Sequence, residues 1–380
     1  MSKVLFTAST YSHIVNFHRP YLAAFRRLGW TVEVACGGDP MDIPEAHRVV
    51  DIPFEKEMTS PRNVAAWRRL RRLMREEQYD LVSCHTALAA FFTRMAIWGL
   101  KRRPKVACTV HGYLFGEDTS PARALVLKAA ERMTAPVTDL LMTMNRWDTQ
   151  YATVHKLGGK IVEVPGIGLD PDRLPPVSAA EREELRRALG VGPEEVLLVY
   201  AAEFSGRKSQ QVLIRAMTRL PREVKLALPG QGALREGCMA LAGELGVAGR
   251  VLFPGQVPGV ARWYGAADLA VSASRSEGLP FNVMEAMHYG LPVVASRVKG
   301  HTDLLEGTGA GLLYPYGDWE ACAGRIGELL RDRELAARMG ALGRNAAADY
   351  ELGRALPLIM AQYGALVPLD RPAAAGRNEA

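Results

Sequence analysis

The chain reads SRSEGLPFNVMEAM from Ser274 to Met287, directly after the apolar run Leu269–Ser272. A short, continuous apolar run is typical of a parallel strand that is buried on both faces of its sheet. Pro280 suits the first turn of a helix, because that position needs no N–H donor. The stretch therefore predicts a strand, a tight turn and a helix, which is the repeating unit of a doubly wound α/β sheet.

The same unit recurs through both halves of the chain. Apolar runs predict strands at Lys3–Ala8, Thr31–Cys36, Asp80–Cys84, Lys105–Val110, Thr138–Thr143, Glu195–Tyr200, Lys225–Leu228, Arg250–Phe253, Leu269–Ser272 and Pro292–Ser296. Helical patterns predict helices at Arg19–Leu28, Pro61–Glu77, Ala87–Leu100, Pro121–Arg132, Gln210–Thr218, Ala233–Leu245, Phe281–Tyr289, Trp319–Arg331 and Glu334–Ala348. This alternation implies an α/β fold with two Rossmann-like, doubly wound parallel sheets.

A linker separates the two halves at 165–176, where PGIGLDPDRLPP holds two glycines and four prolines in twelve residues. We expect an N-terminal domain at 1–172, completed by a helix at 351–366, a second domain at 173–350 and a disordered tail at 367–380. In open α/β sheets ligands bind beyond the carboxyl ends of the strands. Two such domains facing each other would form a cleft with a binding rim on each side, which favours a two-substrate enzyme.

The composition, 48% hydrophobic and 23% charged, is that of an ordinary globular protein. The five cysteines are scattered and never in a C-x-x-C spacing, so we expect neither a disulfide framework nor a zinc site. The formal net charge of +6 is too modest to indicate a nucleic-acid partner, but it suits anionic small molecules or an anionic membrane surface. No apolar run is long enough to span a membrane and the first residues do not form a signal peptide, so we expect a cytoplasmic protein.

The turn after the strand has the chemistry of an anion site. The first amides of the expected helix lack intrahelical partners and lie at the positive end of the helix dipole. They belong to Phe281, Asn282 and Val283. Gly278 lets the backbone approach a ligand closely. Glu277 and Glu285 can each accept hydrogen bonds from paired hydroxyls, so one can hold a sugar and the other a ribose.

With these two glutamates, EGLPFNVMEAMHYGLPVVAS resembles the signature of the family 4 retaining glycosyltransferases of the GT-B fold. Other stretches are similar to further parts of that family: GHTDLLEGTGAGLLYP, NRWD at 145–148, PGIGLD at 165–170, HTALAAFFTRMA and TVHGYLF. The resemblance extends from about residue 3 to 366 and is closest to the capsule and exopolysaccharide branch. It implies two Rossmann-like domains across a cleft, a donor site in the second domain, no metal requirement and no cofactor.

The resemblance also implies roles for the residues around the turn. Glu285 would bind the donor ribose, and Glu277 would be a catalytic residue in contact with sugar hydroxyls near the reacting carbon. The amides of Phe281 and Asn282 would hold the diphosphate. The expected donor-binding residues are Arg207, Lys208, Gly230, Val257, Glu277, Gly278, Leu279, Phe281, Asn282 and Glu285.

A second phosphate element reads AAEFSGRK and ends at Lys208. Lys208 matches a lysine of the family and is an expected catalytic residue, whereas Glu203 stands where relatives carry an arginine and Arg207 can supply the missing charge. Cations at a helix start are unfavourable unless they meet an anion, so we favour phosphate binding over a solvated helix start. Gly230 and Val257 follow strands and would border the diphosphate and the uracil, although both could equally belong to ordinary turns.

Histidines stand at the carboxyl ends of several strands in the first half. A lone histidine is more often a structural hydrogen-bonding group, but His18, His85 and His111 at one rim favour function. In the family a histidine that matches His111 lies near the reacting sugar, so we expect His111 to be catalytic. We expect His13, His18 and His85 to contact the acceptor, and the segment 11–13 replaces a glycine-rich loop of many relatives.

The expected helix at 61–77 carries a row of arginines: Arg62, Arg68, Arg69, Arg71, Arg72 and Arg75. Together with KRRPK at 101–105, they could meet anionic lipid head groups at the inner face of the plasma membrane. A lipid-linked acceptor would give such a peripheral contact a purpose. A solvated basic face explains the pattern equally well.

Together these features predict a retaining glycosyltransferase that moves a hexose or N-acetylhexosamine from a UDP-sugar to a sugar hydroxyl on a lipid-linked or polysaccharide-precursor acceptor. A GT-B nucleotide-sugar epimerase or hydrolase and a non-catalytic sugar-nucleotide-binding protein are the alternatives. A nicotinamide oxidoreductase is disfavoured, because no G-x-G-x-x-G follows the first strand. The sugar stays open among UDP-GlcNAc, UDP-GalNAc, UDP-glucose and UDP-galactose, and a GDP-sugar is disfavoured.

Overall fold

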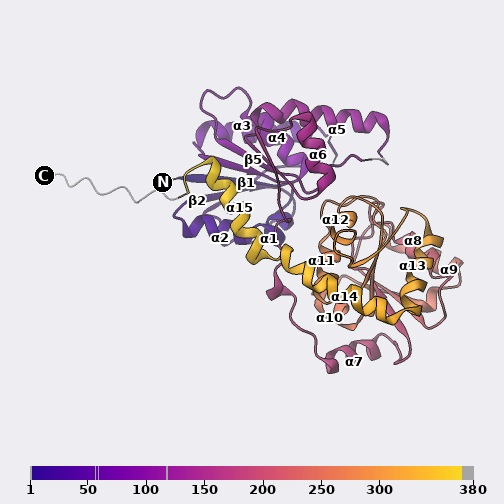
Figure 1. Cartoon of the computed structure of the whole chain (residues 1–380). Helices are drawn as coiled ribbons and strands as arrows, with labels where there is room; N and C mark the ends of the chain where they lie inside the picture. The colour runs from indigo at the N-terminus through magenta and orange to yellow at the C-terminus, as the bar shows by residue number, and fades with distance from the viewer. Residues whose placement is uncertain (1, 56, 59, 117–118, 370–380) are drawn as a thin grey trace. The chain divides into compact units, whose positions relative to one another are not determined.

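The computed structural model describes residues 2–55, 57–58, 60–116 and 119–369, and Figure 1 shows it as a cartoon. These residues form two compact units. Unit 1 contains the chain up to Ile167 together with residues from Ala355 onward, and unit 2 contains Gly168–Arg354. The chain enters unit 2 inside the segment 165–176 and leaves it inside the last helix, α15 (Leu352–Leu366).

Unit 1 is built on seven parallel strands in the order β3-β2-β1-β4-β5-β6-β7. Their bounds are β1 (Lys3–Thr7), β2 (Thr31–Cys36), β3 (Arg48–Asp51), β4 (Leu81–Cys84), β5 (Lys105–Thr109), β6 (Leu140–Thr143) and β7 (Lys160–Glu163). Central strands such as β4 are buried along their whole length. A parallel sheet of this kind needs cover on both faces, because its apolar side chains point in both directions.

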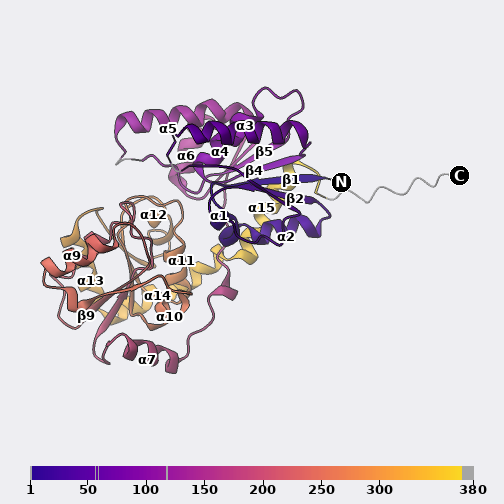
Figure 2. The same cartoon turned by 180° about the vertical axis from the view of Figure 1, so that it is seen from behind.

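Helices cover both faces of this sheet (Figure 1 and Figure 2). One face carries α3 (Pro61–Glu76), α4 (Ala87–Ile97), α5 (Pro121–Thr134) and α6 (Arg146–His155), and the other carries α1 (Tyr11–Phe17), α2 (Arg19–Arg27) and α15. Leu70 and Ile97 belong to the buried cluster on the first face. On the second face, the ring of Phe25 lies 5.8 Å from that of Phe6 and 5.4 Å from that of Tyr363.

Unit 2 is built on six parallel strands in the order β10-β9-β8-β11-β12-β13. Their bounds are β8 (Val196–Val199), β9 (Val224–Pro229), β10 (Val251–Gly255), β11 (Leu269–Ser272), β12 (Val293–Ser296) and β13 (Gly311–Tyr314). The helices are α7 (Ala179–Ala188), α8 (Gln210–Ala216), α9 (Arg235–Glu244), α10 (Ala261–Ala266), α11 (Phe281–His288), α12 (His301–Leu305), α13 (Trp319–Arg331) and α14 (Arg333–Ala347). The expected α/β class with two doubly wound parallel sheets is confirmed.

The apolar runs predict the central strands but not β3, β7 and β13. Each of these is an outermost strand of its sheet, and all four residues of β7 are exposed or only partly buried. β3 and β7 each begin and end with a charged residue, so neither contains the continuous apolar run of a buried strand. β13 is a short strand that begins with a glycine. The sequence patterns also do not predict five helices of the described residues: α1, α6, α7, α10 and α12.

The segment between β1 and His18, for which the sequence predicts no helix, contains α1. Thr10 caps this helix, because its side chain accepts a hydrogen bond from the amide of His13. His18 is the C-cap residue of the same helix, and its amide donates to the carbonyl of Ile14 at 2.8 Å. The helix therefore fixes His13 and His18 on one short rigid element.

The tail expected to be disordered at 367–380 begins with residues that pack on unit 1. Val367 is buried, and the carbonyl of Leu369 accepts a hydrogen bond of 3.2 Å from the indole of Trp30. That expectation is therefore wrong for 367–369, and 370–380 lie outside the described residues. Among the helices of the described part, none combines the length and the apolar character that crossing a membrane requires.

Candidate active site

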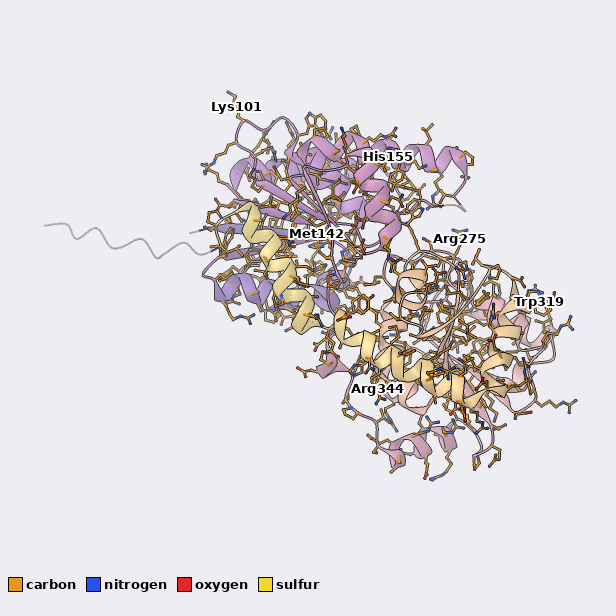
Figure 3. The ribbon with its side chains drawn as sticks, viewed as in Figure 1. Lys101, Met142, His155, Arg275, Trp319 and Arg344 are labelled. Atoms are coloured by element: carbon orange, nitrogen blue, oxygen red, sulfur yellow. The ribbon has the colours of Figure 1, made fainter. Side chains whose placement is uncertain are left out.

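Each sheet reverses its strand order at one point, where diverging loops leave room for a ligand beyond the carboxyl ends of the strands. In unit 2 this point lies between β8 and β11. Arg207 and Lys208 follow β8, and Glu277 follows β11. The amide of Arg275, a residue labelled in Figure 3, donates a hydrogen bond of 2.8 Å to the carbonyl of Arg207. The fold thus joins the two loops that sequence analysis singled out.

Glu277 is only 7% exposed and forms two ion pairs. Its Oε1 lies 2.6 Å from Nζ of Lys208, and its Oε2 lies 2.9 Å from Nη1 of Arg207. Burial by itself would raise the pKa of this carboxyl, but the charges of Lys208 and Arg207 outweigh burial and lower the pKa of Glu277 to about 2. Glu203, in contrast, is exposed to solvent. Arg207 therefore adds the second cation at the site, beside Lys208.

Glu285 is the second carboxyl of the site, and its surroundings raise its pKa, whereas those of Glu277 lower it. Burial of the carboxyl raises the pKa of Glu285 to about 7. The phenol of Tyr264, which donates to Oε2 at 3.1 Å, and the charge of Lys208 reduce this effect without cancelling it. Part of the Glu285 side chain remains accessible to solvent. The ammonium of Lys208 thus lowers the pKa of both carboxyls. Glu277 is ionised, whereas Glu285 titrates near neutral pH.

A buried polar network supports these loops. The phenol of Tyr200 donates a hydrogen bond of 3.1 Å to the carbonyl of Lys208 and contacts Oγ of Ser274 at 2.8 Å. His301 is fully buried and hydrogen-bonds through Nδ1 to the carbonyl of Ser296 at 2.8 Å. Burial lowers the pKa of His301 to about 4, so the imidazole is neutral at physiological pH.

Three residues of the site are not predicted from the sequence: Tyr200, Tyr264 and His301. Tyr200 is the residue after β8 and Tyr264 lies on α10, and neither position carries a motif. Only His301 had an available signal, because it lies in the stretch GHTDLLEGTGAGLLYP that resembles the family. A polar residue inside such a stretch could have been examined as a support for the loop.

At the start of α11, the expectation for the amide of Val283 is wrong. The amide of Val283 donates to the carbonyl of Pro280 at 3.2 Å, so it is not available to a ligand. The helix begins at Phe281, as predicted. Asn282 offers a further polar atom, because its side-chain Oδ1 is buried and has no hydrogen-bond partner among the described residues.

The other expected donor-binding residues lie in tightly packed turns. A Cβ at Gly230 would lie 2.0 Å from a backbone carbonyl of the loop after β8, so this glycine lets the two loops meet. A Cβ at Gly300, where φ is +82°, would lie 2.6 Å from the carbonyl of Gly278. Leu279 is buried, and Val257 follows β10 and is partly exposed.

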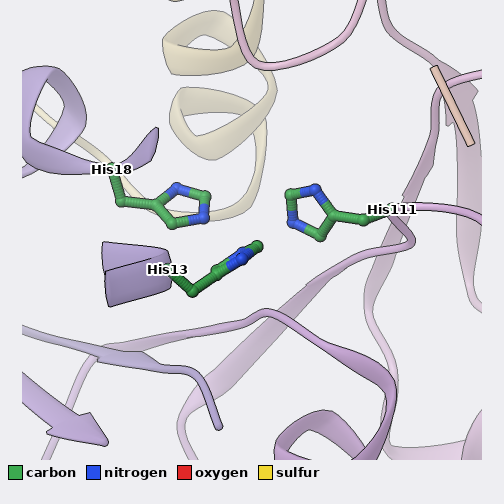
Figure 4. Close-up of side chains that lie close together, drawn as sticks. All are labelled: His13, His18 and His111. Carbon is green, nitrogen blue, oxygen red and sulfur yellow. The ribbon is translucent and has the colours of Figure 1, made fainter. Parts of the chain in front are cut away.

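In unit 1 the strand order reverses between β1 and β4, and four histidines gather there. The ring centroids of His13 and His111 lie 4.7 Å apart, and those of His18 and His85 lie 3.7 Å apart. Figure 4 shows His13, His18 and His111 pointing toward one another. Burial lowers the pKa of all four rings, to about 4 for His13, so they are neutral at physiological pH. The structure thus brings together the four histidines that the sequence singled out.

Five of the six arginines of α3 fall into two groups, and the sixth, Arg75, is exposed. Arg71 donates to the carbonyls of Ala96 and Trp98 at 3.0 and 2.8 Å, and Arg62 pairs with Glu55 at 2.8 Å, so these two arginines already have partners within unit 1. A second group is exposed and lines a concavity of about 510 Å³ in unit 1; it consists of Arg68, Arg69 and Arg72.

A larger concavity of about 980 Å³ in unit 2 lies at the amino ends of β8 and β11. Arg182 and Arg186 line it, and they pair with Asp268 at 2.6 and 2.9 Å. Asp268 thus offsets part of the positive charge of the two arginines within the unit. The concavity is at the opposite end of the strands from Glu277, so we do not assign the site to it.

Two doubly wound sheets, with a cation-rich carboxyl edge in one unit and a histidine-lined edge in the other, define the class of the GT-B glycosyltransferases. Comparison with family models agrees, since residues 21–164 match "Glycosyltransferase Family 4" and residues 181–346 match "Glycosyl transferases group 1". The chain belongs to glycosyltransferase family 4, and its resemblance to that family is confirmed.

Individual relatives cover most of the chain. "Putative glycosyltransferase EpsD" of Bacillus subtilis (strain 168) is 31% identical over 373 residues, which are 97% of this chain and 98% of that protein. A GDP-mannose-dependent alpha-(1-6)-phosphatidylinositol monomannoside mannosyltransferase of Mycolicibacterium smegmatis is 29% identical over 80% of each chain. The structure of Anabaena HepE in complex with UDP and glucose has a TM-score of 0.80 at 20% identity, over 96% of this chain and 100% of that one.

Proposed function

We propose that this glycosyltransferase moves a hexose or N-acetylhexosamine from a UDP-sugar to a sugar hydroxyl, with retention at the anomeric carbon. The observation that carries the proposal is the position of Lys208, which pairs with Glu277 at 2.6 Å and also acts on Glu285. A cation and two carboxyls at the carboxyl edge of a parallel sheet suit a ligand with a diphosphate and paired hydroxyls. A nucleotide sugar has both.

In the proposed mechanism, the donor diphosphate lies against Arg207, Lys208 and the amides of Phe281 and Asn282. Breaking the glycosidic bond adds about one negative charge to the leaving diphosphate, and preorganised cations and helix amides stabilise this charge. When the cations face the phosphates, Glu277 is free to accept hydrogen bonds from sugar hydroxyls. The leaving phosphate accepts the proton of the acceptor hydroxyl. The cations and helix amides take the place that a metal ion would have at the diphosphate.

We propose that the neutral imidazole of His111 lies beside the reacting sugar, where it can donate a hydrogen bond to a hydroxyl. His13, His18 and His85 surround it and are proposed acceptor contacts. The proposed acceptor is a lipid-linked or polysaccharide precursor of a capsule or exopolysaccharide. The exposed arginines of α3 support a peripheral contact with an anionic membrane, in a protein that we expect to be cytoplasmic.

A thermal-shift screen across nucleotide sugars tests the donor. A donor at a hundredfold of its Kd stabilises the protein by about 2.7 kcal/mol, which raises Tm by several degrees. We expect a response to one of UDP-GlcNAc, UDP-GalNAc, UDP-glucose and UDP-galactose, in line with the UDP in the HepE structure. A response to GDP-mannose alone, the donor of the mycobacterial relative, would overturn the choice of UDP.

The stereochemistry of the product tests the reaction. With the donor from the screen and a glycan acceptor, the proton NMR spectrum should show the anomeric configuration of the donor in the product. An inverted product would contradict retention. Release of free UDP without an extended glycan would instead favour the epimerase or hydrolase, and binding without turnover would favour a sugar-nucleotide-binding protein.

A further inference from the structure

We propose that His13, His18 and His111 form a binding site for a divalent transition-metal ion of the Zn²⁺ type in unit 1. One ring nitrogen of each residue lies within 4.8 Å of those of the other two. Figure 4 shows the three rings directed at one shared space. The inference concerns unit 1 alone. With the ion bound, the direct contacts proposed above for His13, His18, His85 and His111 would be replaced, and an acceptor hydroxyl would meet the ion instead.

Two of these rings carry nitrogen atoms that the fold leaves without a partner. Nε2 of His18 and Nε2 of His13 are buried and make no hydrogen bond to any described residue. His18 as a whole is only 1% exposed. Buried polar atoms of folded proteins are paired in the great majority of cases, so such atoms indicate a missing partner. A metal ion would satisfy both nitrogen atoms at once.

The third ring is held in place by a chain of hydrogen bonds. Nε2 of His111 lies 3.3 Å from Nδ1 of His85, and Nε2 of His85 lies 2.9 Å from Oγ of Ser83. Oγ of Ser83 in turn lies 2.8 Å from the phenol of Tyr363. Metal-binding histidines are commonly oriented by outer hydrogen-bond partners of this kind. His85 thus serves as a positioning residue behind the proposed ligands.

The ligand set selects the kind of metal. It offers imidazole nitrogen and no carboxylate, and neutral imidazole suits Zn²⁺, Co²⁺ or Ni²⁺. Mg²⁺ and Ca²⁺ prefer oxygen ligands and should not bind. Three protein ligands leave one tetrahedral position open to water or to a hydroxyl group. The proposal differs from the sequence-based expectation of no metal, because the sequence alone does not show that α1 turns His13 and His18 toward His111.

Isothermal titration calorimetry of tag-free protein, stripped with a chelator, tests the proposal with Zn²⁺ as the probe. We expect one Zn²⁺ per chain and no binding of Mg²⁺. His18→Gln and His13→Gln should each weaken Zn²⁺ binding by more than about tenfold. His155→Gln is the matched control, because His155 lies on α6 outside the cluster, and it should bind Zn²⁺ as the unmodified protein does.

Co²⁺ gives a second measurement that needs no variant. Bound by imidazole alone, it should show visible d–d bands without a thiolate charge-transfer band, and Zn²⁺ should displace them. The proposal is overturned if the unmodified protein binds neither ion, if both histidine variants retain full affinity, or if the Co²⁺ spectrum indicates sulfur ligands.

Discussion

At the scale of single residues, Glu277 and Glu285 differ because of what surrounds them. Two cations hold the pKa of Glu277 at about 2, whereas burial raises the pKa of Glu285 to about 7. The sequence identifies both glutamates through their place around one turn. It does not predict their difference in charge, because that difference depends on Lys208, Arg207 and Tyr264, which other segments contribute.

The low pKa of Glu277 predicts a pH dependence of stability. Because the folded pKa lies below the ordinary value of 4.5, the stabilisation is complete above about pH 5 and is lost as the pH falls toward 2. A shift of this size corresponds to on the order of 3 kcal/mol. Urea unfolding of Glu277→Gln should therefore show lower stability at pH 7 and a flatter decline between about pH 5 and 3. Glu306→Gln removes an exposed partner of Arg297, and its stability should decline with falling pH as that of the unmodified protein does. If stability fell with the same slope in the unmodified protein, Glu277→Gln and Glu306→Gln, the low pKa of Glu277 would be contradicted.

The raised pKa of Glu285 predicts a pH dependence of donor binding. The protonated carboxyl is favoured in the free protein below about pH 7, whereas paired ribose hydroxyls donate to the ionised form. The affinity for a UDP-sugar should thus rise about tenfold or more between pH 5.5 and 7.5, where the donor diphosphate itself does not titrate. Calorimetry at several pH values measures this, and Glu285→Gln should bind more weakly with a flat profile. A flat profile for the unmodified protein would contradict the ribose role.

At the scale of elements, the sequence predicts what one segment decides by itself. A mostly apolar run such as β11 forms a strand that is buried throughout, and Trp319–Arg331 has a helical pattern that matches α13 from end to end. Edge strands and short helices depend on partners elsewhere in the chain. The helix α1 is an example, since its seven residues are held by the cap at Thr10 and by packing of Ile14 rather than by a long periodic pattern.

The turn before α11 gives a prediction at this scale. Gly300 has φ +82° and lies against the carbonyl of Gly278, so an added Cβ meets both an unfavourable backbone conformation and a clash at 2.6 Å. Gly300→Ala should lower the stability by more than about 1–2 kcal/mol and reduce the thermal shift with donor. Gly317→Ala is the matched control, because Gly317 has φ +84° with open space around it. Gly317→Ala should lose less stability than Gly300→Ala and should keep the thermal shift with donor. Equal effects of the two variants would contradict the close packing of the turn.

At the scale of the whole molecule, the repeated alternation of strands and helices predicts two parallel sheets, and the structure has them. The candidate residues gather at two switch points because parallel strands direct all their carboxyl ends to one edge. The sequence does not show which arginines of α3 form hydrogen bonds within the protein and which stay exposed to solvent. Arg71 binds two backbone carbonyls of unit 1, whereas Arg68 and Arg69 in the same row stay exposed.

The exposed arginines predict binding to an anionic membrane. Each basic residue near such a surface contributes about 1 kcal/mol, so replacing Arg68, Arg69 and Arg72 by Gln should weaken co-sedimentation with phosphatidylglycerol vesicles by roughly a hundredfold. Phosphatidylcholine vesicles should bind neither protein. The control replaces three exposed arginines of unit 2, namely Arg215, Arg222 and Arg338. Equal weakening by both sets would show a dependence on net charge and not on α3.

In the proposed mechanism, Lys208 holds the diphosphate of a nucleotide sugar at the carboxyl edge of unit 2. The most direct test is the Kd of the donor from the thermal-shift screen, measured by calorimetry for Lys208→Met and for Lys225→Met. Lys225 lies on β9 and pairs with Glu195 at 2.8 Å. Its replacement by Met therefore removes the same charge as Lys208→Met, but at a position away from the site. We predict that Lys225→Met binds the donor like the unmodified protein and that Lys208→Met binds it at least about thirtyfold more weakly. Equal affinity of the two variants would contradict this prediction.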